Sequence, residues 1–320
     1  MKIQVLAPEG VFDTGLSAIL DVLGTANDMA PATSLGRAPF EISVVGLREK
    51  ALTAQGFTVP LSGAFDPQAG GWLIIPGIGY RTPETLVPVL DRPDIRDAVP
   101  AIREGREAGM NIAAACIGTF ILAETGALDG EKATTTWWLA PLFRQRYPKV
   151  RLEDGNMLVK SGSFITAGAA LGHMDMALWF VRQVSPELAS LVANYLIVDA
   201  RPAQSAYVIT DHLAHADPMV ERFERWARGN LSEGFSLNDA ADAVGASKRT
   251  LARRLQQVLG KTPLSYFQDL RVERAVHLLK TSDKSPDEIA DLVGYADGVT
   301  LRALIRQKLG RGVREVKAMN

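Results

Sequence analysis

Short apolar runs alternate with helical patterns along the first part of the chain. Continuous apolar strands need cover on both faces, so this alternation predicts a mostly parallel sheet with helices on each side. The strand-like runs are IQVLA, EISVVGL, WLIIPG and NIAAAC, and the helical patterns cover 16–29, 94–109 and 118–125. Two further extended segments, NMLVKSG and FITAGAA, precede a long helix that we expect from Met174 to Val198.

Beyond Pro218 the pattern becomes purely helical and contains an internal repeat of about fifty residues. SLNDAADAVG recurs as SPDEIADLVG, and TLARRLQQVLG recurs as TLRALIRQKLG. Each copy has one short helix, a tight turn and a second helix with an apolar face, which is the pattern of a helix-turn-helix unit. The apolar faces of the two second helices comprise Leu251, Leu255, Val258 and Leu259, and Leu301, Leu304, Ile305 and Leu309.

Capping residues mark the ends of the first helix in each copy. Ser236 and Ser285 stand where an N-cap is needed, and Glu288 completes a capping box with Ser285. Gly245 and Gly294 follow the last apolar residue of each helix and predict its end. The repeat therefore predicts two helix-turn-helix units with defined boundaries.

Length and charge divide the chain in two. A chain of 320 residues with 47% hydrophobic content favours two domains. Residues 218–320 hold 18 Lys and Arg against 13 Asp and Glu, a net charge of +5, whereas the preceding residues have a net charge of −6. This asymmetry indicates a basic module that faces a polyanion. We expect domains at 1–200 and 218–320, joined by a linker at 201–217 that is rich in Pro, Ser, His and Asp.

The cysteine count and the hydropathy indicate the cellular compartment in which the protein is expected. Cys116 is the single cysteine, so no intramolecular disulfide forms and a reducing compartment fits. Acidic residues soon interrupt the apolar start, and no later run is long enough to span a membrane. We therefore expect a cytoplasmic protein without membrane partners, and the sequence indicates no metal or cofactor.

The outward face of the first repeat's second helix carries basic and polar side chains. Such side chains suit guanine readout and phosphate contact when the helix lies in the major groove. A basic face is also typical of a solvated helix, but two copies in one basic module favour DNA binding over that alternative. The expected DNA-contacting residues of this helix are Lys248, Arg249, Ala252, Arg253 and Gln256.

Residues 218–320 resemble the DNA-binding domain of the AraC family, through FSLNDAADAVGASKRTLARRL and the repeat described above. The resemblance implies a linker helix at about Pro263 to Lys280 that places the two recognition helices in successive major grooves. It also implies that Arg271 packs internally, and the RGVREVK ending departs from the family pattern at the last helix. In the second groove it places Gly298, Val299, Thr300, Arg302 and Ala303, and we also expect Arg306 to contact DNA.

Cys116 stands directly after an apolar strand and before a helix, as in a nucleophile elbow. In that geometry the helix N-terminus lowers the pKa of the thiol and exposes the sulfur, which makes a reactive nucleophile. The alternative is a buried cysteine that packs as a small apolar residue. Both interpretations are open from the sequence. LIIPGIG at 73–79 adds a turn after another strand, whose backbone N–H groups can face the same crevice.

Residues 1 to about 200 resemble the DJ-1/PfpI, glutamine-amidotransferase-like domain of the GlxA-type subgroup of AraC regulators, through VLAPEGVFDTGLSAILDVL, LIIPG, AAACIGTFILAETGALDG, ATTTWW and FITAGAALGHMDMAL. The resemblance implies a flavodoxin-like, doubly wound sheet. Active relatives pair the cysteine with a histidine, and here Thr136 stands in the expected histidine position. His173 opens a helix, where we expect a packing or capping role, and His212, His215 and His277 lie outside this domain.

A ligand crevice is expected at the carboxyl ends of the parallel strands. Asp13 has a second possible role as a helix cap, and core packing is expected for one of Trp137 and Trp138. The expected lining is Asp13, Gly77, Ile78, Cys116, Ile117, Thr136 and Trp137.

These features predict a sequence-specific transcription regulator with a sensing domain that has no catalytic residues. Its expected partners are double-stranded operator DNA, an unidentified small-molecule effector, a second copy of the chain in a homodimer, and RNA polymerase. The alternative is a cysteine-dependent hydrolase or amidotransferase that carries a DNA-binding module. The absence of an evident general base favours the regulator, because base activation contributes about 10² to 10⁴ in rate. A DNA-bending protein is disfavoured, since shape-only binding needs no base-reading helices.

Overall fold

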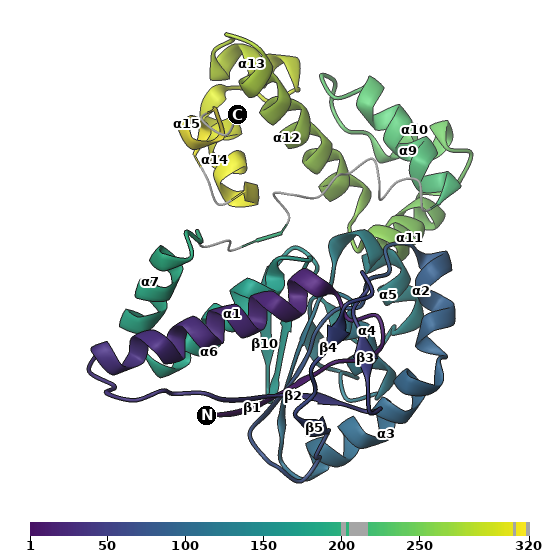
Figure 1. Ribbon diagram of the computed structural model, residues 1–320. Coiled ribbons are helices and arrows are strands. Elements are labelled where there is room, and N and C mark those ends of the chain that lie inside the picture. Colours follow the sequence, from purple (N-terminus) through teal and green to yellow (C-terminus); the bar gives the residue numbers. More distant parts are fainter. Residues whose placement is uncertain (200–202, 205–216, 310–311, 318–320) are drawn as a thin grey trace. The chain divides into compact units, whose positions relative to one another are not determined.

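The computed structural model describes residues 1–199, 203–204, 217–309 and 312–317 (Figure 1). These residues divide into two compact units. The first holds the described residues of 1–139 and 146–204, and the second holds the described residues from 217 onward together with 140–145.

A seven-stranded sheet with the order β10-β11-β7-β6-β1-β2-β5 forms the centre of the first unit. All neighbouring strands run parallel except β10, which is antiparallel to β11. The predicted parallel sheet is confirmed, and the two extended segments after it form a hairpin at its edge. The strands are β1 (Lys2–Leu6), β2 (Glu41–Gly46), β5 (Gly63–Ala64), β6 (Trp72–Ile75), β7 (Asn111–Ala115), β10 (Leu158–Ser161) and β11 (Phe164–Ala167).

Helices cover both faces of this sheet (Figure 1). Alternate strand residues such as Ala113 and Ala115 pack in one cluster with α1 (Asp13–Met29), α6 (Gly172–Val184) and α7 (Pro186–Tyr195). The other face is covered by α2 (Pro83–Leu90), α3 (Pro93–Glu107) and α4 (Gly118–Glu124). The remaining elements are η1 (Ala30–Ala32), β3 (Ala51–Leu52), β4 (Thr58–Val59), β8 (Lys132–Ala133), η2 (Trp137–Leu139), α5 (Ala140–Arg146) and β9 (Arg151–Leu152).

The long helix expected from Met174 to Val198 is two helices, α6 and α7, so that prediction is wrong. Ser185 ends the first helix in an extended conformation, and its side chain accepts a hydrogen bond from the Leu188 N–H at 3.1 Å. Pro186 follows at the first position of α7, where it has no N–H to lose. An N-cap next to a proline therefore separates the helices. No helix in the described part of the chain combines the length and apolar character needed to cross a bilayer.

The second unit is mostly helical, and the order of its helices from residue 218 onward matches the predicted repeat. α12 contacts both helix-turn-helix units, and it agrees with the expected linker helix. The short α15 shows that the departure after residue 310 still allows a final helix. The helices are α9 (Pro218–Gly229), α10 (Leu237–Ala243), α11 (Lys248–Leu259), α12 (Pro263–Thr281), α13 (Pro286–Leu292), α14 (Gly298–Leu309) and α15 (Val313–Lys317).

Two residues of the expected linker at 201–217 form side-chain hydrogen bonds, each with a different one of the two units. Gln204 is fully buried in the first unit, and its amide nitrogen donates to the Thr135 carbonyl at 2.8 Å. Asp217 caps α9 in the second unit, and it accepts from the N–H groups of Met219 and Val220. Most of the remaining linker positions lie outside the described residues.

Candidate functional site

Cys116 lies in a tight turn between β7 and α4. Its φ is +55°, and Cys116 and Ile197 are the non-glycine residues with positive φ among those described. Such a backbone is strained for an L residue, as expected at an elbow. Gly118 makes this turn possible, because a Cβ atom there would lie 2.2 Å from the Ile75 carbonyl oxygen. The predicted strand-turn-helix elbow is confirmed.

The Cys116 thiol is buried, with the residue only 5% exposed. Burial raises the pKa of the thiol to about 12, and the Ile117 backbone and the Thr136 side chain offset only part of that rise. The thiol therefore stays protonated at neutral pH. Of the two interpretations that the sequence leaves open, the structure supports the buried cysteine over an exposed thiol with a lowered pKa.

His173 lies next to this elbow and is fully buried. Its Nε2 accepts from the Gly77 N–H at 2.9 Å, while its Nδ1 donates to the Ala170 carbonyl at 2.5 Å. These partners require the neutral Nδ1–H tautomer. Burial lowers the pKa of His173 to about 4. Both ring nitrogens are engaged by the backbone, so His173 has the expected packing role and holds the turn at Gly77.

The start of α1, the turn after β6 and the elbow come together at one place. The Phe12 N–H donates to the Gly77 carbonyl at 2.8 Å, and Val11 forms an antiparallel bridge with Ile78. A Cβ atom at Gly77 would lie 3.2 Å from that of Cys116. The structure therefore brings together Gly77, Ile78 and Cys116 from the expected lining.

Asp13 carries one buried oxygen atom, Oδ1, without a hydrogen-bond partner among the described residues. Asp13 does not cap α1, because Phe12 is the N-cap residue and no side-chain cap bond forms there. Its other oxygen, Oδ2, accepts from the Gln55 N–H at 3.2 Å. Thr136 is fully buried, and a hydrogen bond from its side chain lowers the pKa of the Cys116 thiol, although burial raises it more. Unpartnered buried acceptors are costly, so a polar ligand group would stabilise this arrangement.

Core packing describes the remaining expected lining residues. Trp137 is 8% exposed and packs edge to face against Trp138, with ring centroids 5.5 Å apart. Ile117 is also buried. The expectation that one of the two tryptophans packs in the core is met by Trp137, since Trp138 is only half-buried.

Sequence reasoning missed two residues near the elbow. The Thr135 hydroxyl donates to the Cys116 carbonyl at 2.7 Å. Gln204 donates to Thr134 Oγ1 at 3.1 Å and accepts from the Ala169 N–H at 3.0 Å. A run of three threonines gives a weak signal for the first residue, whereas a lone glutamine in an irregular segment gives none.

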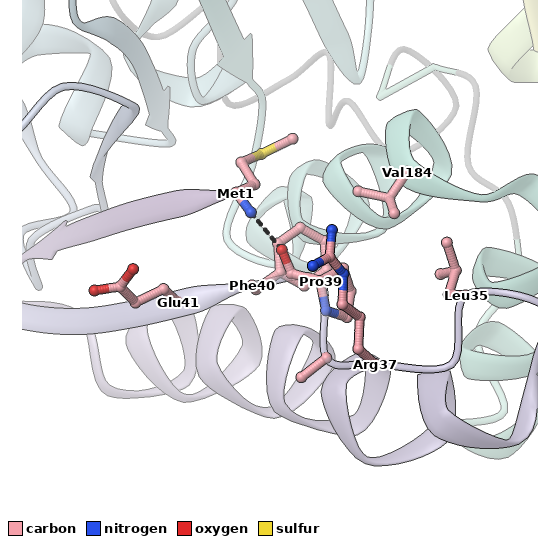
Figure 2. Close-up of a pocket in the computed structure, with 8 residues that line it drawn as sticks. Met1, Leu35, Arg37, Pro39, Phe40, Glu41 and Val184 are labelled. Atoms are coloured by element: carbon pink, nitrogen blue, oxygen red, sulfur yellow. Dashed lines mark hydrogen bonds between the residues drawn. The ribbon is translucent and has the colours of Figure 1, made fainter.

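A separate pocket of about 480 Å³ lies at the amino ends of β1 and β2 (Figure 2). The Met1 amino group donates to the Pro39 carbonyl across it. Cys116 follows the carboxyl end of β7, so this pocket is not the predicted crevice. It contains none of the expected lining residues. Its lining is Met1, Leu35, Arg37, Ala38, Pro39, Phe40, Glu41 and Val184.

Metal-ligating side chains are not grouped in the described part of the chain, where no three His, Cys, Asp or Glu residues are placed to hold an ion. His212 and His215 lie outside the described residues. His277 is exposed on α12.

In the second unit, α11 exposes the predicted basic face. Ser247 caps the helix by accepting from the Thr250 N–H at 3.1 Å. The apolar residues of the predicted inward face are buried. Ala252 is half-buried, and the exposed residues of the expected set are Lys248, Arg249, Arg253 and Gln256.

The second recognition helix, α14, departs from the prediction at its first residue, Gly298. Gly298 is buried, and its N–H donates to Asp287 Oδ1 at 2.8 Å. A Cβ atom there would lie 2.6 Å from the same oxygen. Gly298 therefore does not face outward, which corrects the prediction. The exposed residues of the expected set are Val299, Thr300, Arg302, Ala303 and Arg306.

The caps that were predicted for the two first helices are confirmed. Ser236 accepts from the Asp239 N–H at the start of α10, and Ser285 forms a capping box with Glu288 at α13. Gly245 and Gly294 adopt positive φ of 69° and 78° just after these helices. The tight turns between paired helices therefore rest on local signals in the sequence.

Arg271 has the internal role that was predicted for it. It is 9% exposed, and its guanidinium donates to the carbonyls of Leu231 and Glu233. The same group lies over the rings of Phe267 and Tyr295, at 4.8 Å and 5.2 Å from their centroids. Arg271 thus joins the segment after α9 to the second helix-turn-helix.

An ion pair between Asp217 and Arg254 was not predicted. Arg254 is on α11, and its Nε donates to Asp217 Oδ2 at 2.7 Å. Asp217 is 3% exposed, and hydrogen bonds from Arg254 and the start of α9 outweigh burial and lower the pKa of its carboxyl. Although Arg254 is next to Arg253, it holds α9 against α11 instead of extending the basic face.

Comparisons with known proteins give results for both parts of the chain. A model of the DJ-1/PfpI family matches residues 1–183, and a model of a helix-turn-helix domain matches residues 240–319. The HTH-type transcriptional regulator ArgR of Pseudomonas aeruginosa is 26% identical over 219 residues, which cover 67% of this chain and 66% of ArgR. The regulator GbdR of the same species is 25% identical over 225 residues, which cover 69% of this chain and 61% of GbdR. The matches thus span just under two thirds of the length of these relatives.

Among solved structures, a ThiJ/PfpI family protein from Pseudomonas syringae matches with a TM-score of 0.52. The two are 19% identical, and the match covers 76% of this chain and 90% of the other. At this identity the likeness bears on the fold alone.

Proposed function

Because this chain belongs to the DJ-1/PfpI family and ends in a helix-turn-helix domain, we propose that it is a sequence-specific transcription regulator whose N-terminal domain senses a small molecule. The predicted pairing of these two domains is confirmed by the family matches. The observation that carries the proposal is the exposed row of donors on α11, at Lys248, Arg249 and Arg253. The relatives named as HTH-type transcriptional regulators support it.

Exposed arginine and lysine side chains at the start of a recognition helix suit two kinds of contact. They neutralise phosphates, and they can donate two hydrogen bonds to guanine O6 and N7. In α11 the apolar face is buried against the rest of the domain, so the basic face is the one available to DNA. We infer that the DNA-contacting residues are the exposed members of the two expected sets on α11 and α14, without Gly298 and without Arg254, which pairs with Asp217.

Binding-site selection with the full chain tests this function. We expect one preferred sequence, with affinity falling about 50-fold between 50 and 150 mM salt, as for release of counterions from about four phosphates. Fluorescence anisotropy at several salt concentrations measures the slope. Binding that is independent of sequence, or insensitive to salt, would contradict the proposal.

Arg253→Ala should weaken binding to the selected site by about 5- to 150-fold, as expected for losing a bidentate base contact worth about 1–3 kcal/mol. Preference should relax at one or two base pairs only. Arg48→Ala is the matched control, because Arg48 is an exposed arginine of the N-terminal domain. Equal losses in the two variants would show that α11 does not read the site.

For the N-terminal domain we propose sensing without catalysis. The buried thiol has a raised pKa, and both nitrogens of the neighbouring His173 are engaged by the backbone. A protonated thiol without a free base is a poor nucleophile. The unpartnered Oδ1 of Asp13 supports a ligand crevice near the elbow. We place the effector there, and we propose a cytoplasmic homodimer that acts with RNA polymerase.

Cys116→Ala tests the absence of catalysis. We expect the full chain to show no amidase or glyoxalase turnover above background, and the variant to bind its DNA site within about twofold of the parent. Assays with amide and 2-oxoaldehyde substrates measure the first, and anisotropy measures the second. Turnover in the parent that disappears in Cys116→Ala would show that this domain is an enzyme.

A further inference from the structure

The two recognition helices present different chemistry at equivalent positions. Alignment of the repeat on Thr250 and Thr300 pairs Arg249 with Val299, so the same position carries a long donor in α11 and an apolar side chain in α14. Four residues later in each helix, Arg253 is paired with Ala303. The helix α14 thus lacks the two donors that dominate the outward face of α11.

Val299 is the most exposed large apolar residue among those described in the second unit, at 66%. It occupies the second position of α14, and recognition helices present their N-terminal residues to base edges. Its β-branched side chain has one strongly preferred rotamer in a helix, so little conformational entropy is lost on contact. A rigid apolar side chain at this position suits contact with an apolar group on a base edge in the major groove.

Acidic side chains already occupy amide groups at the start of α14. The Gly298 N–H donates to Asp287, and the Thr300 N–H donates to Asp297 Oδ1 at 2.7 Å. Asp297 is exposed, and hydrogen bonds from Thr300 lower the pKa of its carboxyl, so it is charged at neutral pH. Negative charge there repels phosphate. The first turn of α14 is therefore unsuited to anchoring on the DNA backbone.

We propose that Val299 is a specificity-determining residue that contacts the C5 methyl group of a thymine in the half-site under α14. This inference rests on the proposed DNA-binding function. The thymine methyl is the one apolar group that distinguishes base pairs in the major groove. Arg249 at the equivalent position of α11 reads guanine or phosphate, so the two half-sites differ in chemistry as well as in sequence.

Deoxyuridine substitution tests the contact, because it removes only the methyl group and leaves base pairing unchanged. With the operator selected by the full chain, each thymine is replaced in turn by deoxyuridine and affinity is measured by anisotropy. We expect one thymine, or two adjacent ones, at which the wild-type chain loses about fourfold in affinity, as for one buried methyl group. The Val299→Ala variant should show a loss below about 1.5-fold at that thymine.

Leu292→Ala is the matched control, because Leu292 is 49% exposed on α13 and lies outside the recognition helices. This variant should keep the fourfold deoxyuridine effect. Val299→Arg copies the first repeat, and its selected site should change from thymine to guanine at the same position. A newly gained preference for guanine would show that the side chain at position 299 faces a base edge.

The outcomes separate the contact from the wider function. A selected operator in which no thymine responds to deoxyuridine, or in which Val299→Ala keeps the full response, would overturn the contact and leave DNA binding intact. Failure of the full chain to select any sequence would overturn the proposed function and this inference with it.

Discussion

Arg271→Ala is expected to lower the free energy of unfolding of the C-terminal domain by about 3 to 4 kcal/mol. The substitution leaves the Leu231 and Glu233 carbonyls without their donor; the Leu231 carbonyl is buried and costs about 1–3 kcal/mol when unsatisfied, whereas the part-buried Glu233 carbonyl costs less. It also removes the guanidinium from two aromatic rings. Hydrogen exchange of the α12 amides, compared between parent and variant, measures the change within this domain.

Arg274→Ala is the matched control for that experiment. Arg274 is on the same helix but is exposed, so its removal should change the stability by less than about 0.5 kcal/mol. Arg271→Lys keeps the charge but cannot reach both carbonyls with the same geometry, and it should fall between the two. A loss below about 1 kcal/mol in Arg271→Ala would mean that water replaces the guanidinium at little cost.

Acidification from pH 6.5 to pH 4 is expected to remove about 3 kcal/mol of stability from the N-terminal domain through His173 alone. The ordinary pKa of histidine is 6.5, and in the folded chain the pKa of His173 is lowered to about 4. Above pH 6.5 the ring is neutral in both states and the folded domain has its full stability. As the pH falls, the unfolded chain binds a proton that the buried ring cannot accept, so the folded state loses stability.

The difference between the parent and His173→Gln isolates this contribution. Glutamine does not titrate, so the stability of the variant should depend less steeply on pH in this range, by about one proton. If the variant folds poorly, the imidazole of the parent is titrated directly by NMR, with His173 identified by its nuclear Overhauser contacts to Gly77. Parallel stability curves, or an imidazole pKa above 6, would refute the buried neutral histidine.

Periodicity predicted the main elements because apolar spacing reports burial directly. The central strands and the two helix-turn-helix units follow from runs of at least four residues or from an internal repeat. The hairpin of β3 and β4 was not predictable, since strands of two residues show no alternation. The break between α6 and α7 had a signal in Ser185 and Pro186, but the continuous apolar pattern on both sides outweighed it.

The elbow at Cys116 was predicted in position, but the state of its thiol was not. The elbow at Cys116 follows from a strand, a turn and a helix that are adjacent in sequence. Burial of its thiol depends on residues that are distant in sequence, including Thr136 and His173, and sequence spacing does not report such contacts. The ion pair of Asp217 with Arg254 was missed for the same reason: two helices, α9 and α10, separate its residues in the sequence.

In the proposed complex with DNA, the unequal faces of α11 and α14 give a single chain a polarity along the duplex. A symmetric pair of identical reading helices fits a palindrome and binds equally well in either orientation. Here one helix offers Arg249 and Arg253 where the other offers Val299 and Ala303, so reversing the site exchanges unlike surfaces. One protomer therefore suffices to fix which way the protein points along the duplex, and hence which of its faces is turned toward a neighbouring promoter.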